Sequence, residues 1–170
     1  MKILIAYSSR TGNTRKVAEA LHLELPGADL CPISSSPNPE KYDIVFAGFW
    51  VEEGDANDAM KEYLKQLGGI PVALFATLGA YPDSQHAADC LEAAAAQIPN
   101  GNVVDRFICQ GRIDPMMIEW MEQLPPDDEN APTDSRRQLW KDAEGHPNDQ
   151  DLENAVAWAK AVLEKMKAGA

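Results

Sequence analysis

Five short apolar runs alternate with stretches whose apolar residues recur at helical spacing, and this alternation restricts the possible folds strongly. Strands that are each followed by a helix pair in parallel, and the helices cover both faces of the resulting sheet. The near-continuous apolarity of the runs is typical of strands that are buried on both faces. The sequence therefore predicts an α/β fold with a doubly wound, five-stranded parallel sheet. The predicted strands are residues 2–7, 28–33, 42–49, 71–77 and 103–109.

The predicted helices lie between these strands and after the last of them. The first helix covers residues 13–24. Asp55 or Asn57 is expected to cap the second helix, which extends to about residue 67, because short polar side chains bond free N–H groups at helix starts. The remaining predicted helices end near residue 97, cover residues 116–124 and 134–141, and include residues 152–166.

The turn between the first predicted strand and the first helix is rich in hydroxyl groups. It contains Ser9, Thr11 and Thr14, and Gly12 allows the backbone to approach a ligand closely. The N–H groups at a helix start are free, and the helix dipole favours negative charge there, so a phosphate is the expected ligand. Residues of the same types also serve as simple helix caps. Arg10, in the same turn, either is solvated or adds positive charge to this site.

The spacing Ser9-x-Thr11-Gly12-Asn13-Thr14 resembles the phosphate loop of flavodoxins, which holds the phosphate of FMN. Residues 42–55 and 77–82 resemble the second and third flavodoxin loops, and the resemblance covers roughly residues 1–110 and the last helix. It implies the flavodoxin-like strand order 2-1-3-4-5, in which ligands bind where strands one and three diverge. The cofactor-binding residues that it implies are Ser9, Arg10, Thr11, Gly12, Asn13, Thr14, Trp50, Gly54, Thr77, Leu78, Gly79 and Tyr81.

An isoalloxazine ring is flat and apolar on its faces, so its site needs aromatic or aliphatic covers. Trp50 is the first candidate for such a cover and Tyr81 is the second. The alternatives are that Trp50 belongs to the core at the end of its strand and that Tyr81 is a turn residue beside Pro82. Gly54 is of interest for its backbone, because in flavodoxins a glycine peptide in this loop flips and offers a carbonyl to the ring.

The formal net charge of the 170 residues is −12, and the net charge of residues 111–153 alone is −8. Nucleic-acid binding is disfavoured, because a phosphate backbone needs a basic surface. An acidic surface can steer a basic protein partner. The segment 111–148 leaves the fifth predicted strand at its carboxyl end, so it is expected to be a lid, a substrate wall, an acidic docking surface or a structural cover.

The chain is expected to be a single domain, residues 1–170, that is cytoplasmic and has no membrane or metal partner. No apolar run reaches the roughly 18–20 residues of a membrane span, and the N-terminus enters a strand at once. The cysteines are odd in number and widely spaced, which favours reduced and mostly buried thiols. The histidines show no metal-ligand spacing. The residues concerned are Cys31, Cys90, Cys109, His22, His86 and His146.

Three functions follow from these features. The first is an FMN-binding redox protein that carries electrons to a partner reductase. The second is an FMN-dependent oxidoreductase that acts on a quinone or another small electron acceptor. The third is a flavodoxin-like module that binds a partner without FMN.

Overall fold

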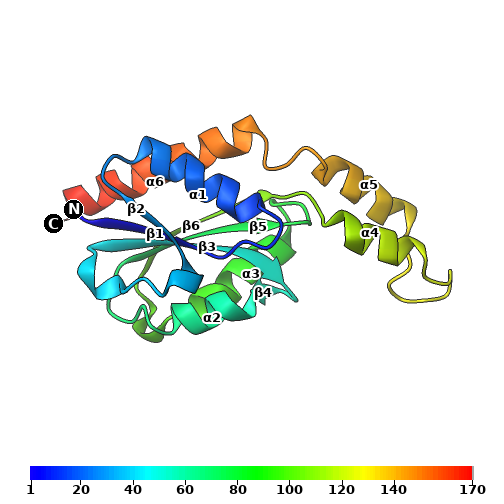
Figure 1. Cartoon of the computed structure of the whole chain (residues 1–170), viewed down its shortest axis with the longest axis horizontal. Coiled ribbons are helices and arrows are strands. Elements are labelled where there is room, and N and C mark those ends of the chain that lie inside the picture. The colour runs from blue at the N-terminus through cyan, green and yellow to red at the C-terminus, as the bar shows by residue number, and fades with distance from the viewer. Residues whose placement is uncertain (170) are drawn as a thin grey trace.

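The computed structural model describes residues 1–169 and has helices on both faces of one sheet (Figure 1). Five strands lie parallel in the order β2-β1-β3-β5-β6, and the short strand β4 pairs antiparallel with the end of β3. The predicted fold class and strand order are confirmed, because β5 and β6 are the fourth and fifth predicted strands. The strands are β1 (Ile3–Tyr7), β2 (Asp29–Pro32), β3 (Ile44–Glu52), β4 (Asp55–Ala56), β5 (Val72–Leu78) and β6 (Val103–Gln110).

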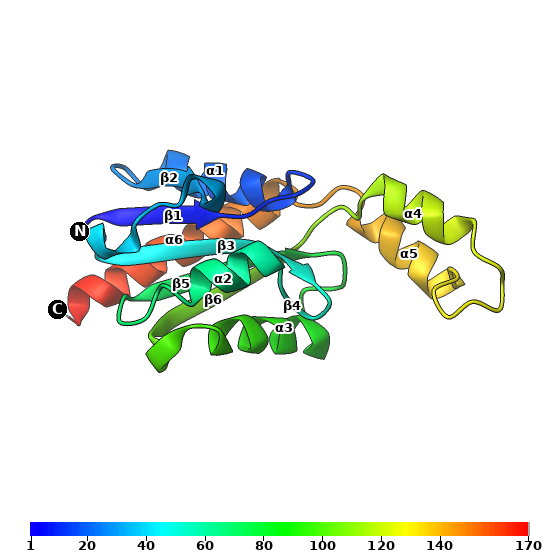
Figure 2. The same ribbon diagram turned by 60° about the horizontal axis from the view of Figure 1, so that its bottom comes forward.

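Two hydrophobic cores lie on opposite faces of the sheet, because successive strand side chains point to opposite faces. Ile5 and Phe46 pack with helices α1 and α6, and Leu4 and Val45 pack with α2 and α3. Figure 2 shows the two helix pairs on either side of the strands. The helices are α1 (Asn13–Glu24), α2 (Asp58–Leu64), α3 (Gln85–Ala96), α4 (Pro115–Glu122), α5 (Asp134–Ala143) and α6 (Asp149–Ala168).

Helices α4 and α5 depart from this layered pattern and form an arm, residues 111–148, that projects beyond the sheet (Figures 1 and 2). The arm begins where β6 ends, at the carboxyl edge of the parallel strands. Arg137 on α5 donates two hydrogen bonds, each 2.8 Å, to the carboxylate of Glu122 on α4. The hydroxyl of Tyr81, in the loop after β5, donates a 2.8 Å hydrogen bond to Asp142 on α5. These contacts hold the two arm helices together and against the domain.

The second predicted loop is instead a β-hairpin. Strand β3 continues to Glu52, which pairs with Asp55 in β4. Glu53 and Gly54 form the two-residue turn, and their φ angles of 50° and 83° match a hairpin turn with two left-handed residues. The predicted capping role of Asp55 was wrong because this residue lies in β4. Asn57 does occupy the N-cap position of α2, as the sequence predicts, but its side chain makes no capping hydrogen bond there.

The three cysteines are free thiols, as the sequence predicts, and Cys90 and Cys109 are buried. Burial raises the pKa of Cys109 to about 12, so this thiol stays protonated and unreactive at neutral pH. Within residues 1–169, no helix combines the length and the apolarity that a membrane span requires.

Candidate functional site

The loop between β1 and α1 presents free backbone N–H groups at the carboxyl edge of the sheet. Gly12 is the N-cap of α1 and has a φ of 100°, in the left-handed region that favours glycine. No side chain caps α1 and no acidic residue lies in its first turn, whereas side chains cap α3, α4, α5 and α6. The Oγ atom of Ser9 is buried without a hydrogen-bond partner among residues 1–169. Free N–H groups, the helix dipole and this hydroxyl fit a phosphate.

Hydrogen bonds tie this phosphate loop to the ends of the neighbouring strands. The Ser8 N–H donates to the carbonyl oxygen of Gly48 in β3 at 2.8 Å. The hydroxyl of Thr14, which is fully buried, lies 2.9 Å from the hydroxyl of Thr77 in β5. These two contacts connect the loop to the ends of β3 and β5.

Two further side-chain amides complete the support of the loop. Asn13 donates a 2.8 Å hydrogen bond to the carbonyl oxygen of Arg112, at the start of the arm. Asn57, after the β3–β4 hairpin, donates a 2.9 Å hydrogen bond to the Ser8 hydroxyl. The phosphate loop is therefore joined to the start of the arm and to the residue that follows the β3–β4 hairpin.

A cavity of about 340 Å³ lies between the phosphate loop, the ends of β3 and β5, and the arm. Trp50, from the end of β3, and Leu78 and Gly79, from the end of β5, contribute to its lining. Ile113 packs so closely to Gly79 that a Cβ there would lie 2.8 Å from the Ile113 side chain. An apolar cavity with a few polar groups is typical of cofactor sites, and its composition suits the faces of a flavin ring.

The same cavity carries positive charge in a strongly acidic protein. Arg10, Arg112 and Arg136 contribute to its lining, and Asp114 is the one acidic residue in that lining among residues 1–169. The Arg10 guanidinium lies 5.8 Å from the centre of the Trp50 ring and 3.8 Å from the Asp114 carboxylate. Three cations against one carboxylate favour an anionic ligand, as FMN is.

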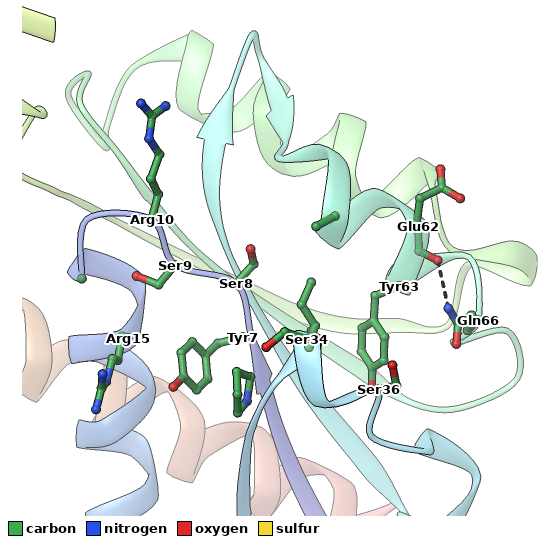
Figure 3. A pocket seen from close by; sticks show the side chains of 14 residues that line it. Tyr7, Ser8, Ser9, Arg10, Arg15, Ser34, Ser36, Glu62, Tyr63 and Gln66 are labelled. Atoms are coloured by element: carbon green, nitrogen blue, oxygen red, sulfur yellow. Dashed lines mark hydrogen bonds between the residues drawn. The ribbon is translucent and has the colours of Figure 1, made fainter.

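A second cavity, of about 680 Å³, opens on the β2 side of the phosphate loop. Figure 3 shows Ser8, Ser9 and Arg10 on one side of it, with Tyr63 and Gln66 of the α2 segment on the other. Arg10 contributes to both cavities, so the phosphate loop separates them. The candidate phosphate site thus borders both cavities.

The predicted cofactor-binding residues do not all gather around the apolar cavity. Thr14 lies behind the loop in its contact with Thr77, and Gly54 lies in the hairpin turn. Tyr81 is exposed, lies outside the lining and contacts Asp142. Ser9 and Gly12 line the larger cavity. Those that line the apolar cavity are Arg10, Thr11, Asn13, Trp50, Thr77, Leu78 and Gly79.

Sequence reasoning did not identify the residues of α4 and α5 that line the apolar cavity. Met117 and Met121 of α4 are spaced i and i+4, and Arg136 and Trp140 of α5 have the same spacing. Residues at this spacing lie on one helix face. The spacing could have shown that each short helix directs one face to a common site, but not which face that is.

The attachment of the arm is expected to weaken in acid. The hydrogen bond from Arg137 lowers the pKa of Glu122, and the hydrogen bond from Tyr81 lowers the pKa of Asp142. Carboxyl groups with lowered pKa values stabilise the folded state above their ordinary values of 4.5 and 3.8. That stabilisation is lost as the pH falls through the lowered values. We expect amide hydrogen exchange of α5, corrected for intrinsic rates, to accelerate a few-fold relative to α6 between pH 6 and pH 3.

In Glu122→Gln, part of this acceleration should already be present at pH 6, because the Arg137 ion pair is absent at every pH. Equal protection of α5 and α6 across the whole pH range would show that these carboxylates do not attach the arm.

Comparisons with known proteins agree with this fold and show the family. The sequence profile of the family described as "Flavodoxin domain" matches residues 4–160. A flavodoxin-like domain-containing protein BilS from Clostridioides difficile is 33% identical, over 97% of this chain and 98% of the relative. Oxidised flavodoxin 2 from Bacillus cereus has a similar structure, with a TM-score of 0.60 at 18% identity over 97% of this chain and 99% of that one. A flavoprotein in complex with FMN from Lactobacillus acidophilus has a TM-score of 0.53 at 18% identity, over 63% and 92% of the two chains.

Proposed function

Because this chain belongs to the flavodoxin-domain family, we propose that it binds one FMN and passes electrons to a partner protein. The observation that carries the proposal is the uncapped, glycine-started α1 beside an apolar cavity lined by Trp50. A phosphate and a flat apolar ring are two chemical parts of FMN. The start of α1 suits the phosphate, and the apolar cavity suits the ring. The flavin supplies the electron chemistry, while the protein supplies binding, orientation and electrostatics.

Each part of the site has a defined task in this proposal. The N–H groups at the start of α1 and the Ser9 and Thr11 hydroxyls hold the phosphate. Trp50 covers one face of the ring. Arg112 and Arg136 stabilise negative charge in the cavity, and the arm side chains exclude water from it.

A small-molecule acceptor is the second candidate, because α4 and α5 add side chains to the cavity that a simple carrier does not require. In that case the protein is an FMN-dependent oxidoreductase for a quinone. Steady-state turnover of quinones with a reduced nicotinamide, compared with transfer to a separate protein, distinguishes the two. Turnover at enzyme-like rates without any protein partner would favour the second candidate.

Replacing Trp50 with alanine is expected to weaken FMN binding by about 10-fold, or about 1.4 kcal/mol, since aromatic contacts add about 0.5–1.5 kcal/mol beyond the area they bury. The visible spectrum of the bound flavin should also shift. Titration of the flavin-free protein with FMN, followed by flavin fluorescence, measures the affinity.

Trp120 provides the matched control, because it is exposed on α4 and does not line the cavity. Trp120→Ala should leave both the FMN affinity and the flavin spectrum unchanged. If Trp50→Ala behaves in the same way while the protein stays folded, Trp50 does not cover the ring.

A further inference from the structure

Helix α4 exposes an unusual amount of apolar surface. Met116, Met117 and Trp120 are 77%, 47% and 54% exposed, and within residues 1–169 they are three of the seven large apolar side chains that are exposed. The helix has eight residues. Exposed apolar groups that gather in one place mark interaction sites, whereas isolated ones need no explanation.

Acidic residues lie on and directly after the helix that carries this exposed α4 face, defined by Met116, Met117 and Trp120. Glu119 lies on the same helix, and the loop after the helix carries Asp127, Asp128 and Glu129. The partner that complements this surface is a protein with an apolar contact area ringed by lysine and arginine.

The exposed α4 face is continuous with the apolar cavity, because Met117 belongs to both. The arm that carries α4 projects beyond the sheet (Figures 1 and 2), and Met116 and Trp120 on it are exposed to solvent. Methionine side chains are flexible and polarizable and adapt to a partner surface.

We infer that the exposed α4 face docks a basic electron-transfer protein, with an apolar contact on the face and charge attraction from Glu119 and the acidic loop after α4. The inference rests on the proposed function, because the docked partner receives electrons from the FMN in the adjacent cavity. With FMN held in the cavity and reduced by an external electron donor, the flavin would give up one electron at each encounter, and the oxidised redox centre of the partner would take it up.

Stopped-flow reduction of oxidised horse cytochrome c, a basic haem protein with lysines around its exposed haem edge, tests the inference. The protein is loaded with FMN and reduced chemically before mixing. Met116→Ala/Trp120→Ala should lower the second-order rate constant about tenfold. Asp127→Asn/Asp128→Asn/Glu129→Gln should flatten its decrease with salt, because exposed charges are screened over about 8 Å at physiological ionic strength.

Leu23→Ala is the matched control, since Leu23 is an exposed apolar residue (80%) on α1, outside the exposed α4 face and the apolar cavity. This variant should transfer electrons to cytochrome c as the parent does. Reduction of a neutral benzoquinone should be equal in all variants, because a small acceptor needs no docking surface.

The inference is overturned if the rate constant for cytochrome c and its salt dependence are the same in the parent, the Met116/Trp120 variant and the acidic variant. Normal quinone reduction in the same samples would show that the flavin is active. An absence of bound FMN would instead contradict the proposed function. Sedimentation that changes from dimer to monomer in Met116→Ala/Trp120→Ala would also overturn it, by assigning the face to a second copy of this chain.

Discussion

Replacing Gly12 with aspartate is expected to reduce the affinity for FMN by at least about 100-fold, or about 2.7 kcal/mol. The new carboxylate stands at the start of α1, where the phosphate of FMN is proposed to bind. Two like charges about 4 Å apart repel each other by about 4 kcal/mol at an effective dielectric constant of 20. The φ of 100° at Gly12 also disfavours any side chain there, which distorts the loop. Equilibrium titration of the flavin-free protein with FMN gives the change.

Gly27→Asp is the matched control for this variant. Gly27 follows the other end of α1, has a φ of 81° and, like Gly12, has no atom within 4 Å of the position that a Cβ would take. Both substitutions therefore carry a similar backbone strain and the same added charge. Only Gly12→Asp should lose FMN. Equal FMN affinities in the two variants would show that the start of α1 does not belong to the FMN-binding site.

Replacing Gly48 with alanine is expected to destabilise the fold by about 3 kcal/mol or more, the upper end of the usual overpacking cost. A Cβ on Gly48 would overlap the ring of Phe75, which is fully buried. For a domain of this size, such a loss lowers the melting temperature by roughly 6–12 °C. Calorimetry of the flavin-free protein measures it without a contribution from ligand binding.

Gly145→Ala should leave the melting temperature nearly unchanged, because no atom lies within 4 Å of the position of its Cβ. If Gly48→Ala changes the melting temperature only slightly, then β3 and β5 can move apart near Gly48. Since Gly48 also accepts the hydrogen bond from Ser8, that separation would move the phosphate loop.

The layers of the fold could be predicted from the sequence because burial leaves a direct pattern in it. Strands covered on both faces need continuous apolar runs, and β1 and β5 show them. Both predicted boundaries of α1, residues 13 and 24, agree with the structure, since Pro26 and Gly27 end the helix. The position of the phosphate loop could be predicted from these elements and from Gly12, which lies between β1 and α1.

The β3–β4 hairpin could not be predicted in the same way. Strand β4 has only two residues, and its turn requires Glu53 to adopt a φ of 50°, which a glutamate does not favour.

The sequence also does not predict which side chains the arm contributes to the apolar cavity. The two helices and their approximate boundaries are visible as patterns, but their orientation depends on contacts between distant residues. Asn13 reaches Arg112, and Tyr81 reaches Asp142. The second contact explains why Tyr81, which resembles a ring cover in the sequence, lies outside the apolar cavity in the structure.

The visible spectrum of the purified protein, with the released cofactor identified by chromatography, tests the central proposal most directly. We expect a yellow protein with a flavin absorption band and one FMN per chain. The flavin-free protein should take up FMN again and should bind riboflavin, which lacks the phosphate, much more weakly. A colourless protein that takes up no FMN would contradict the account and would favour a flavodoxin-like module that acts only by binding a partner.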